Sequence, residues 1–521
     1  MTRKFNTTGL CVPRKHYMVD ISDRVARMRA MVDQGDYFCV NRARQYGKTT
    51  TLSALRRTLA GDYAVAGLDF QALSHADFAT EGAFAGSFAS ILLDAEELGQ
   101  LELPDEATDA LEKLEGAGTP TLKGLFRALR RWLRASARPV VLIIDEVDSA
   151  TNNQVFLDFL AQLRLAYLSR EDDPSYPAFQ SVVLAGVTDV KHLKAKIRPD
   201  GESKVNSPWN IAADFDVVMS FDEADVAGML ADYEEDHATG MDVAAVSDEV
   251  VAWTGGYPFL VSRVCQLMDV RGLAWNRAGV DEAVRLLLKD DDVSLFESLM
   301  GQLENHAELK GALRAMLIAG ERMEYLPYDE TQKLLRMYGF ATERDGMLVI
   351  ANRVFETLLC DHLLGEERDV GLREAAALGR SLFVRDGRLH MRAVLEGFRR
   401  TYEQVFGPLV DRFPEKDGRE LFLLYLKPII NGTGNYYIEA QTRDQTRTDV
   451  VVDYAGERFV VELKVWRGPR YNAEGEEQLR GYLDHFGLSV GYMLSFNFNK
   501  RKVPGLKRVP VDDKVLWEET V

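Results

Sequence analysis

Four short runs of β-forming residues alternate with longer helical patterns between residues 35 and 190. The runs are YFCV, YAVAGLDF, PVVLIIDE and SVVLAGV, which begin at Tyr37, Tyr63, Pro139 and Ser181. This alternation is typical of strands joined by crossover helices. The sequence therefore predicts an α/β fold with a parallel sheet in this part of the chain.

The loop after the first run carries part of a phosphate-binding motif. Tyr37 to Val40 predicts a strand, Gly47-Lys48-Thr49 the following turn, and Thr50 onward a helix. A helix N-terminus attracts phosphate, Lys48 can neutralise terminal phosphates and the Thr49 hydroxyl can bind Mg²⁺. The usual pattern G-x-x-x-x-G-K-[ST] requires glycine where this chain has Arg42. This stretch alone leaves a degraded loop, a chance match and a working variant open.

The third run supplies the partner that such a loop needs. PVVLIIDEVDS predicts an apolar strand that ends in Asp145-Glu146. One carboxylate, Asp145, can hold hydrated Mg²⁺, and its neighbour Glu146 can polarise the attacking water. Loop and strand end together predict an ATP site with Mg²⁺, in which Gly47, Lys48, Thr49 and Thr50 bind ATP, Thr49 and Asp145 bind the metal, and Glu146 is catalytic.

The length and the charge of the chain limit the number of its domains and the kinds of partner that it can bind. The 521 residues predict roughly three units. The net charge of -18 is uneven: residues 1–60 come to +8, residues 441–521 to 0, and the residues between to -26. Only local basic patches could therefore serve a polyanion, such as the one formed by Lys500, Arg501, Lys502, Lys507 and Arg508. An ordinary solvated face explains that patch equally well.

No segment predicts a membrane span or a secretory signal. The longest apolar run, Val140 to Ile144, is far shorter than the roughly 20 residues of a membrane helix. Met1 to Phe5 lacks the apolar stretch of a signal peptide. The four cysteines are scattered without C-x-x-C spacing, which argues against a thiolate metal site or a disulfide framework. We expect a soluble, cytoplasmic protein that is not inserted in a membrane.

The remainder of the chain divides into further regions. Asp222, Glu223, Ser247 and Asp248 offer helix N-terminal signals between residues 221 and 270, which suits a helical lid. GMLVIANRVFETLL predicts a strand followed by a helix, as in a winged-helix-like unit. From about Met391 a helix leads into the strand-like runs YYIEAQT, TDVVVD and RFVVELKV, then a helical stretch and VGYMLSF. We predict an ATPase core at 1–221, a lid at 222–279, a winged-helix-like region at 280–370, a linker at 371–390 and a second α/β domain at 391–521.

Several stretches of the first half together resemble one known family. FNTTGLCVPRKHYMVD, NRARQYGKTTTL, LIIDEVD, GVTDV and TGGYPFLVSRVC look like the bacterial AAA-like ATPases that are fused to a C-terminal nuclease-like domain. In that family an Arg-rich stretch precedes G-K-[ST]. The resemblance therefore implies that Arg42 is the family's own variation and that the loop binds ATP.

The resemblance implies further roles position by position. Tyr17 and Met18, within the segment His16 to Val19, resemble residues that line the adenine; a packed strand is the alternative. Thr188 matches a polar sensor position near the γ-phosphate, or is a helix N-cap before Asp189. Pro258 belongs to a Gly255-to-Pro258 stretch similar to a lid motif, which a plain turn between helices also explains. No arginine finger is assigned; Arg198 is a candidate.

TDVVVDYAGERFVVELKVW is the most informative stretch of the C-terminal third. Side chains alternate along a strand, so Glu462 and Lys464 share one face, whereas Val461, Leu463 and Val465 take the other. Asp449 opens the preceding strand, and a turn at 454–456 folds the two into a hairpin that could bring Asp449 beside Glu462. Two carboxylates can hold Mg²⁺, and a lysine can orient water for attack on a phosphodiester. A solvated, salt-bridged face is the alternative.

This arrangement resembles the PD-(D/E)xK nuclease superfamily. The resemblance implies that Asp449 and Glu462 are metal ligands, that Asp449, Glu462 and Lys464 are catalytic, that Glu420 contributes a helix acid to the metal, and that Gln478 supports the site. Thr448 stands where the superfamily has proline. Arg443 and Arg447 could contact phosphate, although exposed arginines need no such role.

The combined reading is α/β: a P-loop ATPase parallel sheet with helical lid and winged-helix region, followed by a PD-(D/E)xK-like α/β domain. We expect ATP and Mg²⁺ as cofactors, DNA or RNA as partner and substrate, a nucleotide-regulated nuclease activity that serves bacterial defence, and assembly into a homo-oligomer. The alternatives are an ATP-driven switch whose C-terminal domain binds nucleic acid or protein without cleaving, and a scaffold with both sites silent.

Overall fold

The structure, a computed structural model, describes residues 3–188, 190, 208–318, 321–365, 382–406, 415–430, 433–437, 450–466, 469–499 and 502–521. The chain forms two compact units. The first unit comprises residues 1–243, 256–266 and 337–339, and the second comprises residues 244–255, 267–336 and 340–521.

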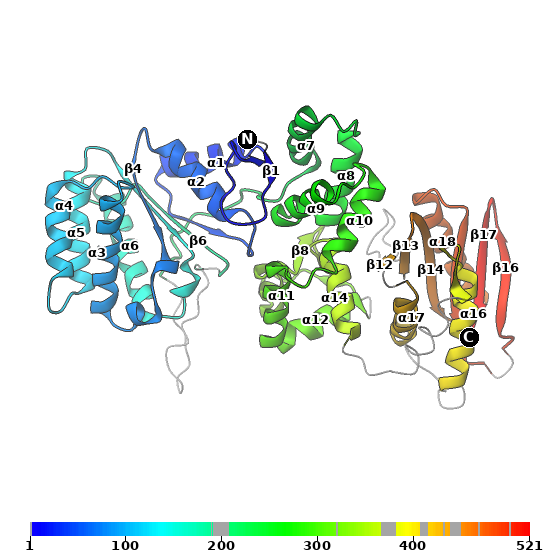
Figure 1. The fold of residues 1–521 in the computed structure, drawn as a ribbon. Helices are drawn as coiled ribbons and strands as arrows, with labels where there is room; N and C mark the ends of the chain where they lie inside the picture. The colour runs from blue at the N-terminus through cyan, green and yellow to red at the C-terminus, as the bar shows by residue number, and fades with distance from the viewer. Residues whose placement is uncertain are drawn as a thin grey trace. The chain divides into compact units, whose positions relative to one another are not determined.

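A four-stranded parallel sheet forms the centre of the first unit (Figure 1). Its strands are β3 (Phe38–Asn41), β4 (Ala64–Asp69), β5 (Val140–Asp145) and β6 (Ser181–Gly186). They lie in the order β3-β6-β5-β4, and every neighbouring pair is parallel. All four β-forming runs of the sequence are therefore strands of one sheet.

Helices cover both faces of this sheet, which explains why its strands are apolar throughout. On one face Val141, Ile143 and Val183 pack with residues of α1 (Ser22–Gln34) and α2 (Lys48–Leu59). On the other face Leu142 and Leu184 belong to a larger core that α3 to α6 complete (Figure 1). The remaining elements are α3 (Glu81–Glu97), α4 (Asp105–Glu115), α5 (Leu122–Ala135), α6 (Gln154–Asp172), β1 (Lys4–Phe5), β2 (His16–Tyr17), and the 3-10 helices η1 (Phe70–Ala72), η2 (His75–Phe78) and η3 (Val147–Ser149).

Three helices follow, as predicted for the lid. They are α7 (Glu223–His237), α8 (Val243–Thr254) and α9 (Pro258–Arg271). Helix α7 begins at the predicted signal, because Asp222 and Asp225 form a reciprocal capping box. The helix start predicted at Ser247 and Asp248 is wrong. Ser247 lies inside α8, where it is buried and its hydroxyl donates to the carbonyl oxygen of Ala244.

Residues 277–365 combine helices with a small antiparallel sheet of order β7-β9-β8. The predicted strand and helix of GMLVIANRVFETLL are β9 and α14. The elements are α10 (Arg277–Leu287), α11 (Ser294–Asn305), α12 (Ala307–Leu317), β7 (Met323–Glu324), α13 (Glu330–Met337), β8 (Ala341–Arg344), β9 (Met347–Ile350) and α14 (Arg353–Gly365).

The C-terminal part contains a mixed sheet of order β12-β13-β14-β15-β17-β16. Strands β14, β15 and β17 are parallel neighbours, and the outer pairs are antiparallel. The strands are β12 (Gly434–Tyr437), β13 (Val450–Tyr454), β14 (Glu457–Val465), β15 (Val490–Phe496), β16 (Gly505–Val511) and β17 (Lys514–Thr520). The sequence predicted β12 to β15, whereas β16 and β17 were not predicted.

Helices cover both faces of the mixed sheet. Leu479, Tyr482 and Leu483 of α18 (Pro469–His485) pack on Val460 and its neighbours. On the other face Phe398 of α16 (Met391–Phe406) lies against Phe496 and against α17 (Glu415–Ile430). Part of the stretch predicted as a linker forms a hairpin, β10 (Val384–Arg385) with β11 (Arg388–Leu389). Among the described residues, no helix has the length and apolar content to cross a membrane.

Candidate functional site

The loop between β3 and α2 turns into the helix at Gly47. Gly47 has φ 78°, in the left-handed region that favours glycine. Gly47 is also the N-cap of α2, and it offers no side chain to cap the first N–H groups. The helix start therefore presents backbone donors and its positive dipole end to an anion.

Lys48 is held inside this loop. Its side chain is buried, and Nζ donates to the carbonyl oxygens of Arg42 at 3.0 Å and Ala43 at 3.1 Å. Burial lowers the pKa of Lys48, and the carboxylates of Glu146, Asp148 and Asp145 oppose that shift. A phosphate beside Nζ would supply the negative charge that favours a buried ammonium.

The predicted metal ligands meet at the carboxyl end of β5. Thr49 Oγ1 donates to Asp145 Oδ2 at 2.9 Å, and the backbone N–H of Glu146 donates to Asp145 Oδ1 at 3.0 Å. Burial raises the pKa of both Asp145 and Glu146. A hydroxyl and a carboxylate are the hard oxygen ligands that Mg²⁺ prefers, so the residues present fit this ion. The adjacent Thr50 accepts a hydrogen bond from the backbone of Cys11 at 3.2 Å.

Asp148, which was not among the predicted site residues, joins two strand ends. Its carboxylate accepts the backbone N–H groups of Val187 at 2.8 Å and Thr188 at 2.7 Å. Thr188 is thereby fixed beside the end of β5. The third acid of the DEVD stretch was the available signal. Asp189 and Arg198 lie outside the described residues.

Arg42 turns its side chain away from the loop. Its guanidinium donates to the carbonyl oxygens of Asn41 at 2.8 Å and Val217 at 2.9 Å, and it lies 5.3 Å from the ring centroid of Phe215. Its backbone N–H donates to Gly186 of β6 at 3.1 Å. Position 42 thus ties the loop to neighbouring backbone.

The Gly255-to-Pro258 stretch reaches the same loop. The Tyr257 hydroxyl donates to the carbonyl oxygen of Arg44, and its ring lies edge-on to Tyr46 at 4.6 Å. Pro258 Cβ is 4.0 Å from the position that a Cβ on Gly47 would take. The backbone of Gly256 accepts the N–H of Phe221 at 2.8 Å. The structure therefore places Tyr257 and Pro258 next to the loop between β3 and α2. The nucleotide-binding role of Pro258 stays a prediction.

Tyr17 lies in an aromatic cluster. It is 1% exposed, its ring contacts Phe5, Tyr233 and His237, and its hydroxyl donates to Asp236 at 2.8 Å. These contacts are those of the packed-strand alternative. The adenine-lining role of Tyr17 and Met18 stays a prediction.

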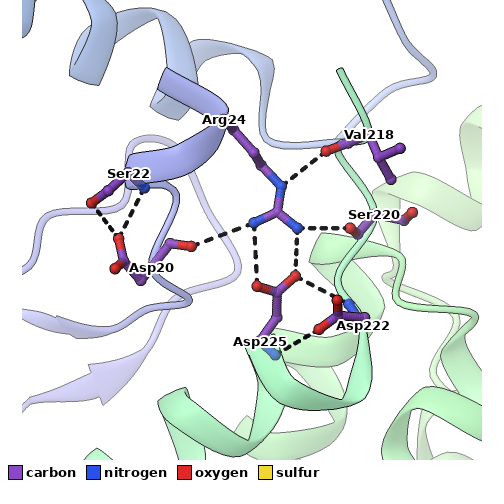
Figure 2. Close-up of polar contacts among 7 residues, drawn as sticks. All are labelled: Asp20, Ser22, Arg24, Val218, Ser220, Asp222 and Asp225. Atoms are coloured by element: carbon purple, nitrogen blue, oxygen red, sulfur yellow. Dashed lines mark hydrogen bonds and ion pairs between the residues drawn. The ribbon is translucent and has the colours of Figure 1, made fainter. Parts of the chain in front are cut away.

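An arginine of α1 fastens the segment that leads into α7 (Figure 2). Arg24 donates to the carbonyl oxygens of Val218 at 2.9 Å and Ser220 at 3.0 Å, and it pairs with the carboxylate of Asp225. Asp225 also belongs to the capping box with Asp222. One guanidinium therefore connects α1, the incoming chain and the start of α7.

A second polar cluster lies on the mixed sheet. Glu462 and Lys464 of β14 are 2% and 6% exposed, and Lys464 Nζ lies 3.8 Å from Glu462 Oε1. The alternative of a solvated face is therefore wrong. A Cβ on Gly475 of α18 would lie 2.8 Å from Lys464 Cδ, so this helix packs directly on the lysine.

The cluster continues across the sheet through residues that sequence reasoning missed. Lys464 pairs in register with Ser495 of β15, whose hydroxyl donates to Glu518 Oε1 at 2.7 Å. Glu518 of β17 is 1% exposed and its Oε2 lies 2.7 Å from Lys507 Nζ of β16. These residues form a polar row across the sheet: Glu462, Lys464, Ser495, Glu518 and Lys507. No short sequence motif predicts this polar row, because each strand contributes only one or two of its residues.

The other predicted residues of this site are placed as follows. Glu420 lies on α17, and its carboxylate pairs with Arg314 of α12. Gln478 lies on α18. Asp449, Arg443, Arg447, Lys500 and Arg501 lie outside the described residues. The structure thus brings Glu462 and Lys464 together, and the roles of Asp449, Glu420 and Gln478 stay predictions.

A family model and a curated relative match parts of this chain. A family model described as AAA-like domain matches residues 15–358. An uncharacterized WD repeat-containing protein of Synechocystis sp. is 25% identical over 241 residues, which cover 42% of this chain and 19% of that protein. The chain therefore spans about a fifth of this curated relative.

Two solved structures show similarity at low identity. A Walker-type ATPase of Pyrococcus abyssi is 15% identical and covers 68% of this chain and 99% of its own, with a TM-score of 0.46. Cdc6p of Pyrobaculum aerophilum is 13% identical and covers 69% of this chain and 98% of its own, with a TM-score of 0.33. At these TM-scores neither likeness establishes a shared fold.

Proposed function

The chain belongs to the AAA-like domain family, which implies ATP binding, and from this premise we propose that its first unit binds ATP with Mg²⁺ and hydrolyses it. The observation that carries the proposal is the hydrogen bond from Thr49 to Asp145 at 2.9 Å, which joins the loop to the strand-end carboxylate. A hydroxyl and a carboxylate in contact at a strand end are oxygen ligands of the kind that a nucleotide-bound Mg²⁺ takes, which supports the proposal.

Each residue of the site has a separate task. The N–H groups at the start of α2 and Lys48 hold the phosphates, and Thr49 and Asp145 hold the ion. Bound Mg²⁺ would neutralise charge that develops on the phosphates. Glu146 orients the water and takes its proton, since its carboxylate follows Asp145 directly at the strand end. Thr188, fixed by Asp148, contacts the terminal phosphate.

Nucleotide binding and turnover of variants test this proposal. Lys48→Ala should abolish ATP binding, whereas Glu146→Gln should retain binding and lose hydrolysis. Thr49→Val should lose the Mg²⁺ dependence, while Thr58→Val at the far end of α2 should behave like the parent protein. Equal ATP affinity in Lys48→Ala and the parent would refute the assignment.

We propose a second activity for the C-terminal sheet, metal-dependent cleavage of a phosphodiester. The buried pair Glu462 and Lys464, at the carboxyl end of β14, supports it. Glu462, with Asp449 and Glu420 as predicted further ligands, would hold Mg²⁺, which supplies an activated water. Lys464 orients that water, and the attack breaks a phosphorus–oxygen bond. Gln478 supports the site.

Cleavage of labelled DNA and RNA with Mg²⁺ or Mn²⁺ tests the second activity. Lys464→Ala should retain metal binding and lose turnover, and Glu462→Gln should weaken both. Cleavage that survives in Lys464→Ala would remove this proposal and leave the alternative, a domain that binds nucleic acid or protein without cutting. We also propose that residues 280–370 form a winged-helix-like region and that the protein assembles into a homo-oligomer.

A further inference from the structure

A cavity of about 790 Å³ opens at the carboxyl ends of β14, β15 and β17. Its lining includes Trp466, which follows β14, Asn497, which follows β15, and Glu518 of β17. Lys502 and Lys507 lie in the same lining. The cavity thus combines two ammonium groups, a carboxamide and an indole, and it shares Glu518 with the polar row that leads to Lys464.

The side chain of Lys507 is positioned by a buried carboxylate on the neighbouring strand. Glu518 lies directly opposite it on β17, with Oε2 at 2.7 Å from Nζ, and Ser495 donates to the other carboxylate oxygen. Glu518 is 1% exposed, whereas the Lys507 side chain is 57% exposed. An ammonium has three donors, so one contact to Glu518 leaves donors for a ligand. The buried carboxylate therefore orients a lysine whose head faces the cavity.

The neighbouring basic residue on the same strand faces the other way. Arg508 is exposed and follows Lys507, so strand alternation directs it to the opposite face of the sheet. The basic patch of the sequence is thus divided by the fold. Lys502 and Lys507 belong to the cavity, and Arg508 does not.

We propose that this cavity binds a segment of single-stranded nucleic acid, with Lys502 and Lys507 on its phosphates and Trp466 stacked on a base. This inference rests on the proposed phosphodiesterase, whose Glu462 and Lys464 belong to the same polar row. Cationic contacts combined with aromatic stacking are the usual means of binding single strands. A chain of net charge -18 needs such a local cationic site to hold a polyanion.

Binding of a fluorescent oligothymidylate of about 16 nucleotides tests the proposal. The full chain carries Lys48→Ala, which removes the proposed ATP site, and EDTA prevents cleavage. Lys502→Gln and Lys507→Gln are compared with Arg508→Gln, which removes the same charge from the opposite face. Glutamine at 507 keeps a donor for Glu518. Melting temperatures verify that each variant is folded.

The two kinds of contact predict different salt behaviour. Each lysine variant should weaken binding about tenfold and lower the slope of log K against log salt by about 0.7. Trp466→Ala should weaken binding by roughly tenfold with an unchanged slope. Arg508→Gln should change affinity much less and leave the slope as it is.

Three results would overturn the inference: no binding by the full chain, an equal slope change in Arg508→Gln, or binding of thymidine monophosphate as tight as that of the strand. Adding Mg²⁺ to the same oligonucleotide separates the two proposals. If cleavage depends on Lys464 but Lys502→Gln and Lys507→Gln show neither the weaker binding nor the lower salt slope, only this inference is removed. If Lys502→Gln and Lys507→Gln show the expected losses but the oligonucleotide is not cleaved, the proposed phosphodiesterase is removed and the binding site remains.

Discussion

Arg42 stands at a motif position where glycine is usual, and its side chain bonds the backbone beside the loop. Glycine is absent there, yet Lys48 still bonds the carbonyl oxygens of the loop. The arginine side chain bonds Asn41 and Val217 outside the loop. Its role is therefore to attach the loop to the backbone beside it.

Arg42→Gly should leave ATP affinity within a small factor and lower stability by about 2 kcal/mol, because charged hydrogen bonds to two carbonyls are lost. Thermal melting and nucleotide titration measure the two effects. Arg44→Gly, at an exposed side chain of the same loop, is the matched control and should cost less. A complete loss of ATP binding in Arg42→Gly would instead place this side chain on the nucleotide.

Glu146 couples stability to pH. Burial raises its pKa, so the folded protein binds this proton more tightly than the unfolded chain. The charged carboxylate therefore costs stability at neutral pH, and the cost disappears as the pH falls through the raised pKa. Glu146→Gln should raise the melting temperature of the nucleotide-free protein at neutral pH and have little effect below the ordinary glutamate pKa. The exposed Glu235→Gln is the control for the removal of one carboxylate charge.

At the scale of elements, α1 is fastened to the start of α7 by Arg24. The guanidinium bonds two carbonyl oxygens and Asp225 at once, and both charged side chains are at most 19% exposed. Lysine keeps the charge but lacks the planar fork. Arg24→Lys should lower stability by about 2 kcal/mol. Arg27→Lys is the control on the same helix, since its pair with Asp216 is exposed and worth about 0–1 kcal/mol. Equal melting temperatures would contradict the fastening role.

Helix α18 positions the lysine of the mixed sheet. A Cβ on Gly475 would meet Lys464 Cδ at 2.8 Å and Cε at 2.9 Å, and a flexible side chain can move aside. Gly475→Ala should therefore displace the ammonium, abolish most phosphodiester cleavage and change the melting temperature little. Gly481→Ala on the same helix is the control, because no described atom lies within 4 Å of its Cβ position. Full activity in Gly475→Ala would show that Lys464 acts from another position.

At the scale of the whole molecule, the two polar sites belong to different compact units. ATP with Mg²⁺ at a hundred times its Kd should stabilise the protein by about 2.7 kcal/mol through linkage. Lys48→Ala should lose this rise in melting temperature, and Lys464→Ala should keep it. A Lys464→Ala protein that no longer responds to ATP would show that the nucleotide acts through the C-terminal site.

The sequence by itself determined the features that depend on neighbouring residues. Apolar runs and helical patterns predicted the four parallel strands, because strand and helix periodicities are local. Gly47-Lys48-Thr49 and Asp145-Glu146 predicted the nucleotide site, since each group occupies a strand end and parallel strands end at one edge. Alternation along β14 predicted that Glu462 and Lys464 share a face.

Only the tertiary structure decided which distant groups meet. Glu518, Ser495 and Lys507 join Lys464 because β17 inserts between β15 and β16, an order that no local pattern encodes. The pairing of Arg24 with Asp225 spans 201 residues of sequence. The sequence could not decide whether Glu462 and Lys464 form a solvated pair or an enclosed pair, because both have the same E-x-K spacing. The burial of the two side chains in the structure decided it. These contacts depend on the packing of whole elements, which residue periodicity leaves open.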